Sequence, residues 1–326
     1  MTSREIVMKT IKFESPERLA YDFSPKFGSD FVKMEMDPTP NARLNSGKDE
    51  WGAVWQNIGV CRLGEVKEYP LRDWNDFEKL KIPEINDPNR WLKIKGARKT
   101  AGEKFLLGTG ISIFERVHFL RGLDNTWTDI YEHPDELKQL INVLVEMNLA
   151  AIKYYAQEGF DGYYFTDDWG LQNKLMISPS EWSEFWKPGY EKIYKTAHEY
   201  GIFTFLHSCG HIVDILDELI EVGLDVINMD QQENMGLELL GNRFRGRITF
   251  YNPVDIQNTM ITGSLEDIRS YCRNMFKNLG SINGGFIPKW YQDPIGVGHT
   301  DEAIDAMCEE FFNISNEVFG KSNKPD

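Results

Sequence analysis

The sequence has few cysteines and no long apolar run, and both absences limit what the protein can be. Its cysteines, Cys61, Cys209, Cys272 and Cys308, show no C-x-x-C spacing, which argues against a disulfide scaffold or a structural zinc knuckle. No stretch approaches the about 20 apolar residues of a membrane-spanning helix, and residues 1–23 lack the apolar core of a secretory signal. We therefore expect a cytoplasmic protein.

Positive charge is also scarce. The chain has 36 Lys and Arg against 51 Asp and Glu, a formal net charge of -15. A surface of this sign repels phosphate, which argues against nucleic acid or an anionic membrane as the main partner. No G-x-G-x-x-G or P-loop pattern follows a predicted strand, so the usual nucleotide-binding fingerprints are absent as well.

The 326 residues, 41% of them hydrophobic, suffice for one large globular unit. Short apolar runs, which predict strands, alternate with segments of helical periodicity. The runs cover residues 18–23, 104–110, 161–167, 203–209, 225–230, 247–252 and 284–288. This alternation predicts a parallel sheet covered by helices on both faces. With an eighth strand in an irregular part, we predict a single α/β domain over residues 1–326, a (β/α)8 TIM barrel; an open doubly wound sheet is the alternative.

Residues 37–100 differ from the rest, because turn residues are frequent and Gly64 separates two extended runs. This pattern predicts an N-terminal insertion that carries a hairpin and caps the barrel. Its aromatic residues Trp51, Trp55 and Tyr69 could face a pocket at the strand ends or pack a small core of the insertion, and we favour the core.

Helix boundaries are well marked in the sequence. Thr2 with Glu5, and Ser178 with Glu181, form predicted capping boxes at helix N-termini. Another helix is expected between Ser264 and Gly280, and Pro188 should kink or break the helix that begins near Ser178.

His207 and Cys209 end the apolar run of residues 203–209. Alternate side chains of a strand point to the same side, so both would face the barrel interior at the strand end where active sites collect. We expect the N-terminus of the following helix to lower the Cys209 pKa and favour the thiolate that a metal binds. The alternative is an ordinary buried cysteine beside a hydrogen-bonded histidine.

Asp167 and Asp168 follow another strand and are candidate catalytic acids, although Asp is also common in turns. Other strand-end candidates would line the same rim. As substrate-binding residues we predict Trp169, Gln172, Asp255, Gln257, Trp290 and Tyr291, and residues 230–233 are a weaker candidate segment.

Several of these segments resemble the uroporphyrinogen decarboxylase superfamily, in an order that spans nearly the whole chain. They are residues 1–23, 167–182, 207–228, 252–268 and 284–307. The resemblance implies a (β/α)8 barrel. It also implies one of two activities, decarboxylation in haem biosynthesis or zinc-dependent methyl transfer between corrinoid proteins, methoxylated or methylated compounds and thiols.

In the methyltransferase branch an H-x-C pair binds zinc, which the resemblance places on His207 and Cys209. The family's third ligand, a Cys in a Gly-Cys pair, has no counterpart after residues 284–288. Cys272 and Cys308 lie in predicted helices and do not replace it. The remaining candidates for a third ligand are Asp167, Asp168, Glu233, Asp293 and His299.

The decarboxylase branch fits less well, because residues 21–30 contain one Lys and no Arg where that branch carries an arginine-bearing segment. The resemblance therefore favours a zinc-dependent methyltransferase, with the corrinoid on a separate partner protein and a homodimer as the expected assembly. In such an enzyme Asp167 or Asp168 could protonate a leaving oxygen while Trp169, Trp290 and Tyr291 pack the substrate. A metal-free decarboxylase or lyase, and a non-catalytic barrel that binds a small molecule, are the alternatives.

Overall fold

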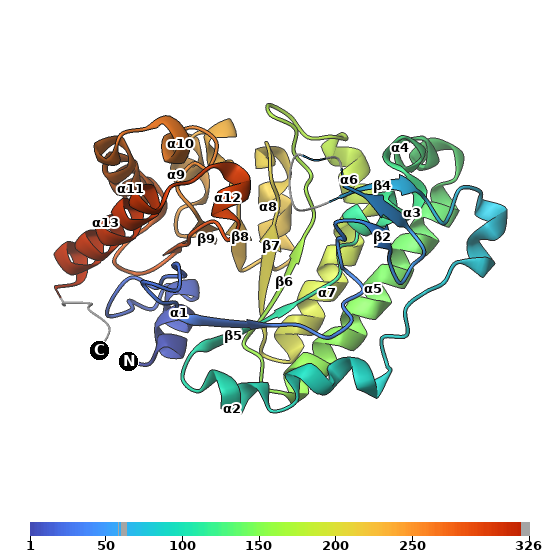
Figure 1. Cartoon of the computed structure of the whole chain (residues 1–326), viewed down its shortest axis with the longest axis horizontal. Coiled ribbons are helices and arrows are strands. Elements are labelled where there is room, and N and C mark those ends of the chain that lie inside the picture. Colours follow the sequence, from blue (N-terminus) through green and yellow to red (C-terminus); the bar gives the residue numbers. More distant parts are fainter. Residues whose placement is uncertain (58, 60–63, 321–326) are drawn as a thin grey trace.

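A computed structural model describes residues 1–57, 59 and 64–320 (Figure 1). Parallel strands form one seven-stranded sheet in the order β1-β5-β6-β7-β8-β9-β10. Their bounds are β1 Phe31–Met34, β5 Phe105–Thr109, β6 Gly162–Thr166, β7 Phe203–His207, β8 Val226–Asn228, β9 Thr249–Asn252 and β10 Phe286–Pro288. The order follows the chain without a reversal, so the predicted barrel is confirmed and the doubly wound alternative is wrong.

The two edge strands, β1 and β10, are joined through Asp22. The Asp22 N–H donates to the Pro288 carbonyl at 3.0 Å, the Trp290 N–H donates to the Asp22 carbonyl at 2.9 Å, and Asp22 also pairs with Ser29. The predicted first strand at residues 18–23 is thus reduced to isolated bridges at Asp22. This short segment takes the place of the eighth strand.

The barrel interior is filled by aromatic and aliphatic side chains from the strands, and α1 (Ser3–Ile11) closes its N-terminal end. Ile6, Val7 and Ile11 of α1 belong to the same buried cluster as Phe31 and Phe105. The opposite end of the strands is therefore the end left for a polar site.

Helices between the strands cover the outside of the barrel, and in Figure 1 α5 and α7 run beside one another. The longer helices are α4 Leu123–Glu132, α5 Pro134–Gln157, α7 Lys187–Glu199, α8 Val213–Glu221, α9 Leu237–Phe244, α11 Leu265–Leu279 and α13 Asp301–Phe319. The shorter ones are α2 Ala97–Ala101, α3 Glu115–Arg121, α6 Pro179–Phe185, α10 Thr259–Thr262, α12 Pro294–Val297, η1 Trp74–Lys79, η2 Pro88–Ile94 and η3 Gln232–Asn234.

The predicted helix boundaries are confirmed at three N-termini. Thr2, Ser178 and Ser264 each accept a hydrogen bond from the backbone of the third helical residue, and all three form complete capping boxes. The expected break near Pro188 lies at Trp186, between α6 and α7.

The insertion contains a three-stranded antiparallel sheet of β2 (Gly47–Lys48), β3 (Val54–Gln56) and β4 (Glu65–Glu68). Trp51 and Trp55 are buried, as expected for packing residues. They contact α3 rather than a core of the insertion alone, because the Trp55 ring lies 4.9 Å from the Phe119 ring and Arg116 lies over the Trp51 ring. Among the described residues Cys209, Cys272 and Cys308 are free thiols, and Cys61 lies outside the described residues.

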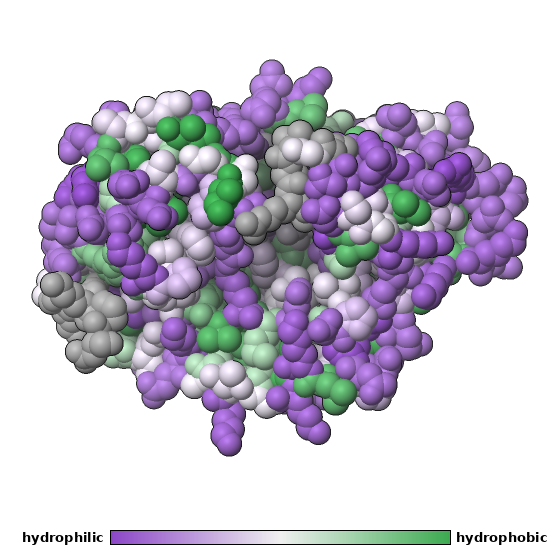
Figure 2. All heavy atoms as spheres, viewed as in Figure 1, coloured by the Kyte–Doolittle hydropathy of each residue, from purple (hydrophilic) through white to green (hydrophobic). Residues whose placement is uncertain are grey.

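The visible face of the molecule in Figure 2 is mainly hydrophilic, and hydrophobic residues occupy scattered spots. In the described part of the chain, no helix combines the length and apolar character required to span a bilayer. Both observations agree with the scarcity of long apolar runs in the sequence.

Candidate metal centre at the strand ends

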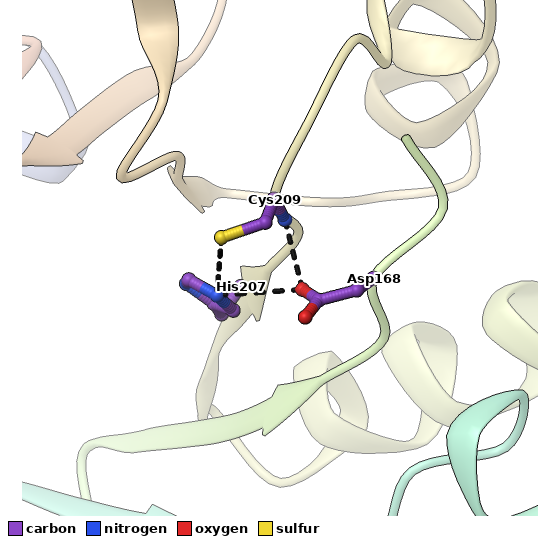
Figure 3. A group of neighbouring side chains, drawn as sticks. All are labelled: Asp168, His207 and Cys209. Carbon is purple, nitrogen blue, oxygen red and sulfur yellow. Dashed lines mark hydrogen bonds and ion pairs between the residues drawn. The ribbon is translucent and has the colours of Figure 1, made fainter. Parts of the chain in front are cut away.

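Three potential metal ligands converge at the C-terminal ends of β6 and β7 (Figure 3). His207 Nε2 lies 3.2 Å from Cys209 Sγ and 3.4 Å from Asp168 Oδ1. The Cys209 N–H donates to Asp168 Oδ1 at 2.8 Å, which connects the loop after β6 to the loop after β7. The three ligand atoms lie within 4.8 Å of one another, and no second cluster of this kind occurs among the described residues.

The donor set and its spacing fit a zinc ion. Zinc in proteins binds cysteine sulfur, histidine nitrogen and carboxylate oxygen at 2.0 to 2.3 Å in a tetrahedral arrangement, which separates neighbouring ligand atoms by about 3.3–3.6 Å. The two distances from His207 Nε2 are close to this range. Three protein ligands also leave one position for water or substrate, as in catalytic zinc sites.

The ring nitrogen of His207 that points away from Cys209 contacts Asn228, the last residue of β8. Nδ1 of His207 lies 2.8 Å from Asn228 Oδ1, so Nε2 faces Cys209 and Asp168. A metal-binding histidine typically has such a partner on its other ring nitrogen.

A cavity of about 690 Å³ lies beside these three residues. Tyr164, Tyr251 and Tyr291 supply aromatic surface to it, and Arg43 from the insertion reaches its wall. The insertion therefore contributes to the cavity through Arg43 and Lys93 rather than through Trp51 or Trp55. A volume of this size suits a small organic molecule.

The cations of this cavity face carboxylates. Lys33 Nζ lies 2.6 Å from Asp22, Lys289 Nζ lies 3.2 Å from Asp230, and Arg43 forms an ion pair with Glu115. Lys93, which also lines the cavity, has its Nζ 3.7 Å from Asp37 Oδ2. The positive charges are thus largely neutralised by the protein itself.

The pKa of the Cys209 thiol is shifted in the direction opposite to the expected one. Burial raises its pKa, and the nearby carboxylates of Asp168 and Asp230 raise it further. Helix α8 begins only at Val213, so its amides do not outweigh these effects. The prediction that the helix lowers the Cys209 pKa is wrong for the metal-free chain, and a cation bound beside the sulfur is what would favour the thiolate.

Asp167 lies on the other side of its strand end, away from the cavity. Its carboxylate accepts hydrogen bonds from the backbone N–H groups of Ile113, Phe114 and Glu115 at the start of α3, and from the Tyr190 hydroxyl. Complete burial raises its pKa to about 7. We therefore assign Asp167 to the anchoring of α3 and correct its prediction as a catalytic acid.

Trp169 is likewise a core residue. Its ring is fully buried and stacks on Phe114 with centroids 4.0 Å apart, and its Nε1 donates to the Tyr190 hydroxyl at 2.8 Å. Since it has no surface toward the cavity, its predicted substrate contact is not supported.

Of the other predicted substrate-binding residues, Tyr291 lines the cavity. Asp255 is buried and accepts hydrogen bonds from Gln257 and Thr259, so it shapes the turn before α10. Trp290 is half-buried against the hydrophobic core, and Gln172 and Gln257 are exposed. The structure thus separates these residues from the metal candidates, apart from Tyr291.

The alternative third ligands do not join the cluster. Asp293 caps α12 through the Gly296 N–H, His299 Nε2 lies 3.1 Å from the Ile256 carbonyl, and Glu233 bonds to the Tyr271 hydroxyl. Asp168 is therefore the residue of the predicted set that lies with His207 and Cys209 in one cluster of potential ligands.

Sequence reasoning missed Asn228, Lys289, Tyr164 and Arg43. Lys289 directly follows a predicted strand, so the rule that strand ends carry active sites could have identified it, whereas Asn228 lies inside the predicted run of residues 225–230 and ends only the observed β8. Tyr164 lies inside β6 and Arg43 lies in the insertion, where no sequence pattern marked them.

Comparisons with known proteins identify the family and the fold of the chain. A family model for uroporphyrinogen decarboxylase (URO-D) matches residues 63–287. The methylcobamide:CoM methyltransferase MtbA of Methanosarcina mazei is 22% identical over 78% of this chain and 70% of its own length. A uroporphyrinogen decarboxylase of Geotalea daltonii is 25% identical over 53% of this chain and 52% of its own length. The structure of a methyltransferase from Methanosarcina mazei superposes with a TM-score of 0.72 at 15% identity, covering 96% of this chain and 99% of that one, which shows the shared fold.

Proposed function

Because this chain belongs to the uroporphyrinogen decarboxylase family, we propose that it is a zinc-dependent methyltransferase of that family. It would move a methyl group between a corrinoid on a separate protein and a small methoxylated or methylated compound or a thiol. The methyltransferase assignment is supported by the relatives from two Methanosarcina species, both of which bear the name methylcobamide:CoM methyltransferase.

The observation that carries the proposal is the convergence of Asp168, His207 and Cys209 beside the cavity. Bound zinc would supply positive charge that holds a thiol as its thiolate or polarises an ether oxygen at neutral pH. Asp168 takes the place of the family's missing cysteine as the third ligand. The ligands would then be one oxygen, one nitrogen and one sulfur atom, and carboxylate oxygen is among the ligands that zinc accepts.

The surrounding side chains would bind and orient the substrate. Burial raises the pKa of Tyr291 to about 12, so its hydroxyl remains a hydrogen-bond donor at neutral pH. Tyr164, Tyr251 and Tyr291 offer aromatic surface that packs against an apolar substrate body. Arg43 and Lys93 bring the insertion to the wall of the cavity, where their side chains would contact the substrate.

Decarboxylation of a polycarboxylate substrate is less well supported. The cations Lys33, Arg43 and Lys289 already face Asp22, Glu115 and Asp230. A substrate with many carboxylates would have to compete with these partners, and burial of an unpaired carboxylate is costly.

The test combines metal analysis with turnover. We expect the purified protein to bind one zinc per chain and to transfer the methyl group of methylcobalamin to at least one member of a thiol panel. His207→Ala and Cys209→Ala should lower zinc affinity by more than about 100-fold, because loss of a direct ligand exceeds the 10–100-fold cost of an outer partner. A folded wild-type protein that binds no zinc would contradict the proposal.

A further inference from the structure

Asn228 lies at the centre of a buried hydrogen-bond network behind His207. Its Oδ1 lies 2.8 Å from His207 Nδ1, accepts a hydrogen bond from the Tyr164 hydroxyl at 2.9 Å and lies 3.4 Å from Lys289 Nζ. Its Nδ2 donates to Asp230 Oδ1 at 2.7 Å. Asn228 is only 1% exposed, so bulk water cannot replace these partners.

The neighbours of Asn228 determine the orientation of its carboxamide. An ammonium group only donates hydrogen bonds and an ionised carboxylate only accepts them. Asp230 Oδ1 lies 3.2 Å from Lys289 Nζ, an ion pair in which the ammonium donates and the carboxylate accepts. Rotation of the amide by half a turn would place its NH₂ group against Lys289 and its oxygen against Asp230, and both contacts would be repulsive.

The oriented carboxamide in turn determines the tautomer of His207. Oδ1 of Asn228 can only accept, so Nδ1 of the neutral imidazole must carry the proton. The lone pair then lies on Nε2, the nitrogen that faces Cys209 Sγ and Asp168 Oδ1. The opposite tautomer would bring a nitrogen lone pair and an oxygen lone pair together at 2.8 Å.

We propose that Asn228 is a positioning residue that holds His207 in the Nδ1–H tautomer and directs the Nε2 lone pair into the candidate metal centre. Tyr164, Asp230 and Lys289 act through Asn228 by fixing its carboxamide. The consequence for metal binding rests on the proposed function. The tautomer is a property of the metal-free chain and can be measured in the absence of zinc.

The test begins with ¹⁵N NMR of the imidazole groups in the metal-free protein. A His207→Gln variant identifies the His207 signals among those of the six histidines. At a pH high enough to make the His207 ring neutral, we expect a protonated Nδ1 and an unprotonated Nε2 in the wild type, and a mixture of tautomers in Asn228→Leu. Asn228→Asp keeps an acceptor at this position and should keep the Nδ1–H tautomer.

Asn252→Leu is the matched control. Asn252 also ends a strand and is also buried, but its Oδ1 accepts from the Met229 backbone N–H rather than from a histidine. The Asn252→Leu variant should lose stability as Asn228→Leu does, and its His207 signals should match those of the wild type. If Asn228→Leu does not fold, Tyr164→Phe removes one donor to Asn228 and should produce a smaller change of the same kind.

Zinc affinity, measured by competition with a chromophoric chelator, should fall about 10–100-fold in Asn228→Leu, as for other outer partners of metal-bound histidines. The proposal is overturned if Asn228→Leu keeps the wild-type tautomer, or if Asn252→Leu changes it equally. A wild type that shows the Asn228-dependent tautomer but binds no zinc would refute the proposed function and leave this inference intact.

Discussion

Asp167 and Asp168 are neighbours in the sequence, yet their side chains lie in different environments. Asp167 points away from the cavity and receives the N-terminus of α3, whereas Asp168 points toward His207 and Cys209. The carboxylate that binds backbone amides contributes to stability, and the carboxylate that faces the cavity is free to bind a metal.

Replacement of each aspartate by asparagine should therefore change a different property of the protein. Asp167→Asn places an NH₂ group against the backbone N–H of Ile113 or Phe114 and should lower the free energy of unfolding by about 1–3 kcal/mol. Asp168→Asn should change unfolding by less than about 0.5 kcal/mol and weaken zinc binding. Denaturant titration and zinc competition measure the two effects, and equal effects on both quantities would contradict the assignment.

His118 makes stability depend on pH. Burial, together with the nearby guanidinium groups of Arg43 and Arg116, lowers its pKa to about 3. Below pH 6.5 the unfolded chain binds a proton that the folded chain does not, so this histidine reduces stability as the pH falls from about 6.5 toward 3. The free energy of unfolding changes by about 1.4 kcal/mol per pH unit when the folded and unfolded chains differ by one full proton.

The variant His118→Gln should remove that slope, because glutamine does not titrate. Unfolding free energies of both proteins at several values between pH 7 and 5 provide the measurement. If the difference between wild type and variant stays constant over this range, His118 binds its proton equally in the folded and unfolded chains and the assignment is wrong.

At the scale of elements, the insertion is fixed to α3 by a buried ion pair. Arg116 Nη1 of α3 lies 2.9 Å from Asp49, and both side chains are almost fully buried. The same carboxylate accepts hydrogen bonds from the Trp51 and Ala53 N–H groups and from Trp55 Nε1. One side chain thus joins the small sheet to the barrel.

Asp49→Ala leaves the Arg116 guanidinium buried without its carboxylate and should lower the free energy of unfolding by about 3–5 kcal/mol. Hydrogen exchange should accelerate first in β2, β3 and β4, and more than in β6 and β7. Glu65→Ala is the control, because its ion pair with Lys67 is exposed and contributes about 0–1 kcal/mol. Uniform acceleration in every strand would contradict a local anchoring role.

At the scale of the whole molecule, closure of the barrel depends on the short segment at Asp22. The Asp22 side chain accepts hydrogen bonds from Ser29 and Lys33 and bonds to the Tyr251 hydroxyl. The Asp22 backbone connects the two edge strands. A polar side chain inside the barrel thus replaces much of the backbone pairing that a full strand would provide.

Asp22→Ala should therefore weaken the junction between β1 and β10 and leave Lys33 without its carboxylate. We expect faster amide exchange in β1 and β10 and a loss of unfolding free energy of about 3–5 kcal/mol. Asp305→Ala, which removes an exposed ion pair with Lys26, is the control. Exchange that stays at the wild-type rate in both edge strands would show that the barrel closes without Asp22.

The sequence by itself determined the repeating strand and helix pattern, the capping boxes and the placement of His207 and Cys209 at a strand end. These features depend on local periodicity and on residues close together in the chain. The same local logic misplaced the first strand, because residues 18–23 have a strand-like pattern but form only isolated bridges at Asp22.

Only the tertiary structure decided which strand-end residues share one cavity. Two adjacent aspartates can point to opposite sides of a strand end, and the sequence does not say which one faces inward. His207 contacts Asn228 of β8, and the further partners of Asn228 come from β6 and from the residue after β10, elements that are far apart in the chain. Their approach is set by the closed parallel sheet, which brings the ends of distant strands to one rim.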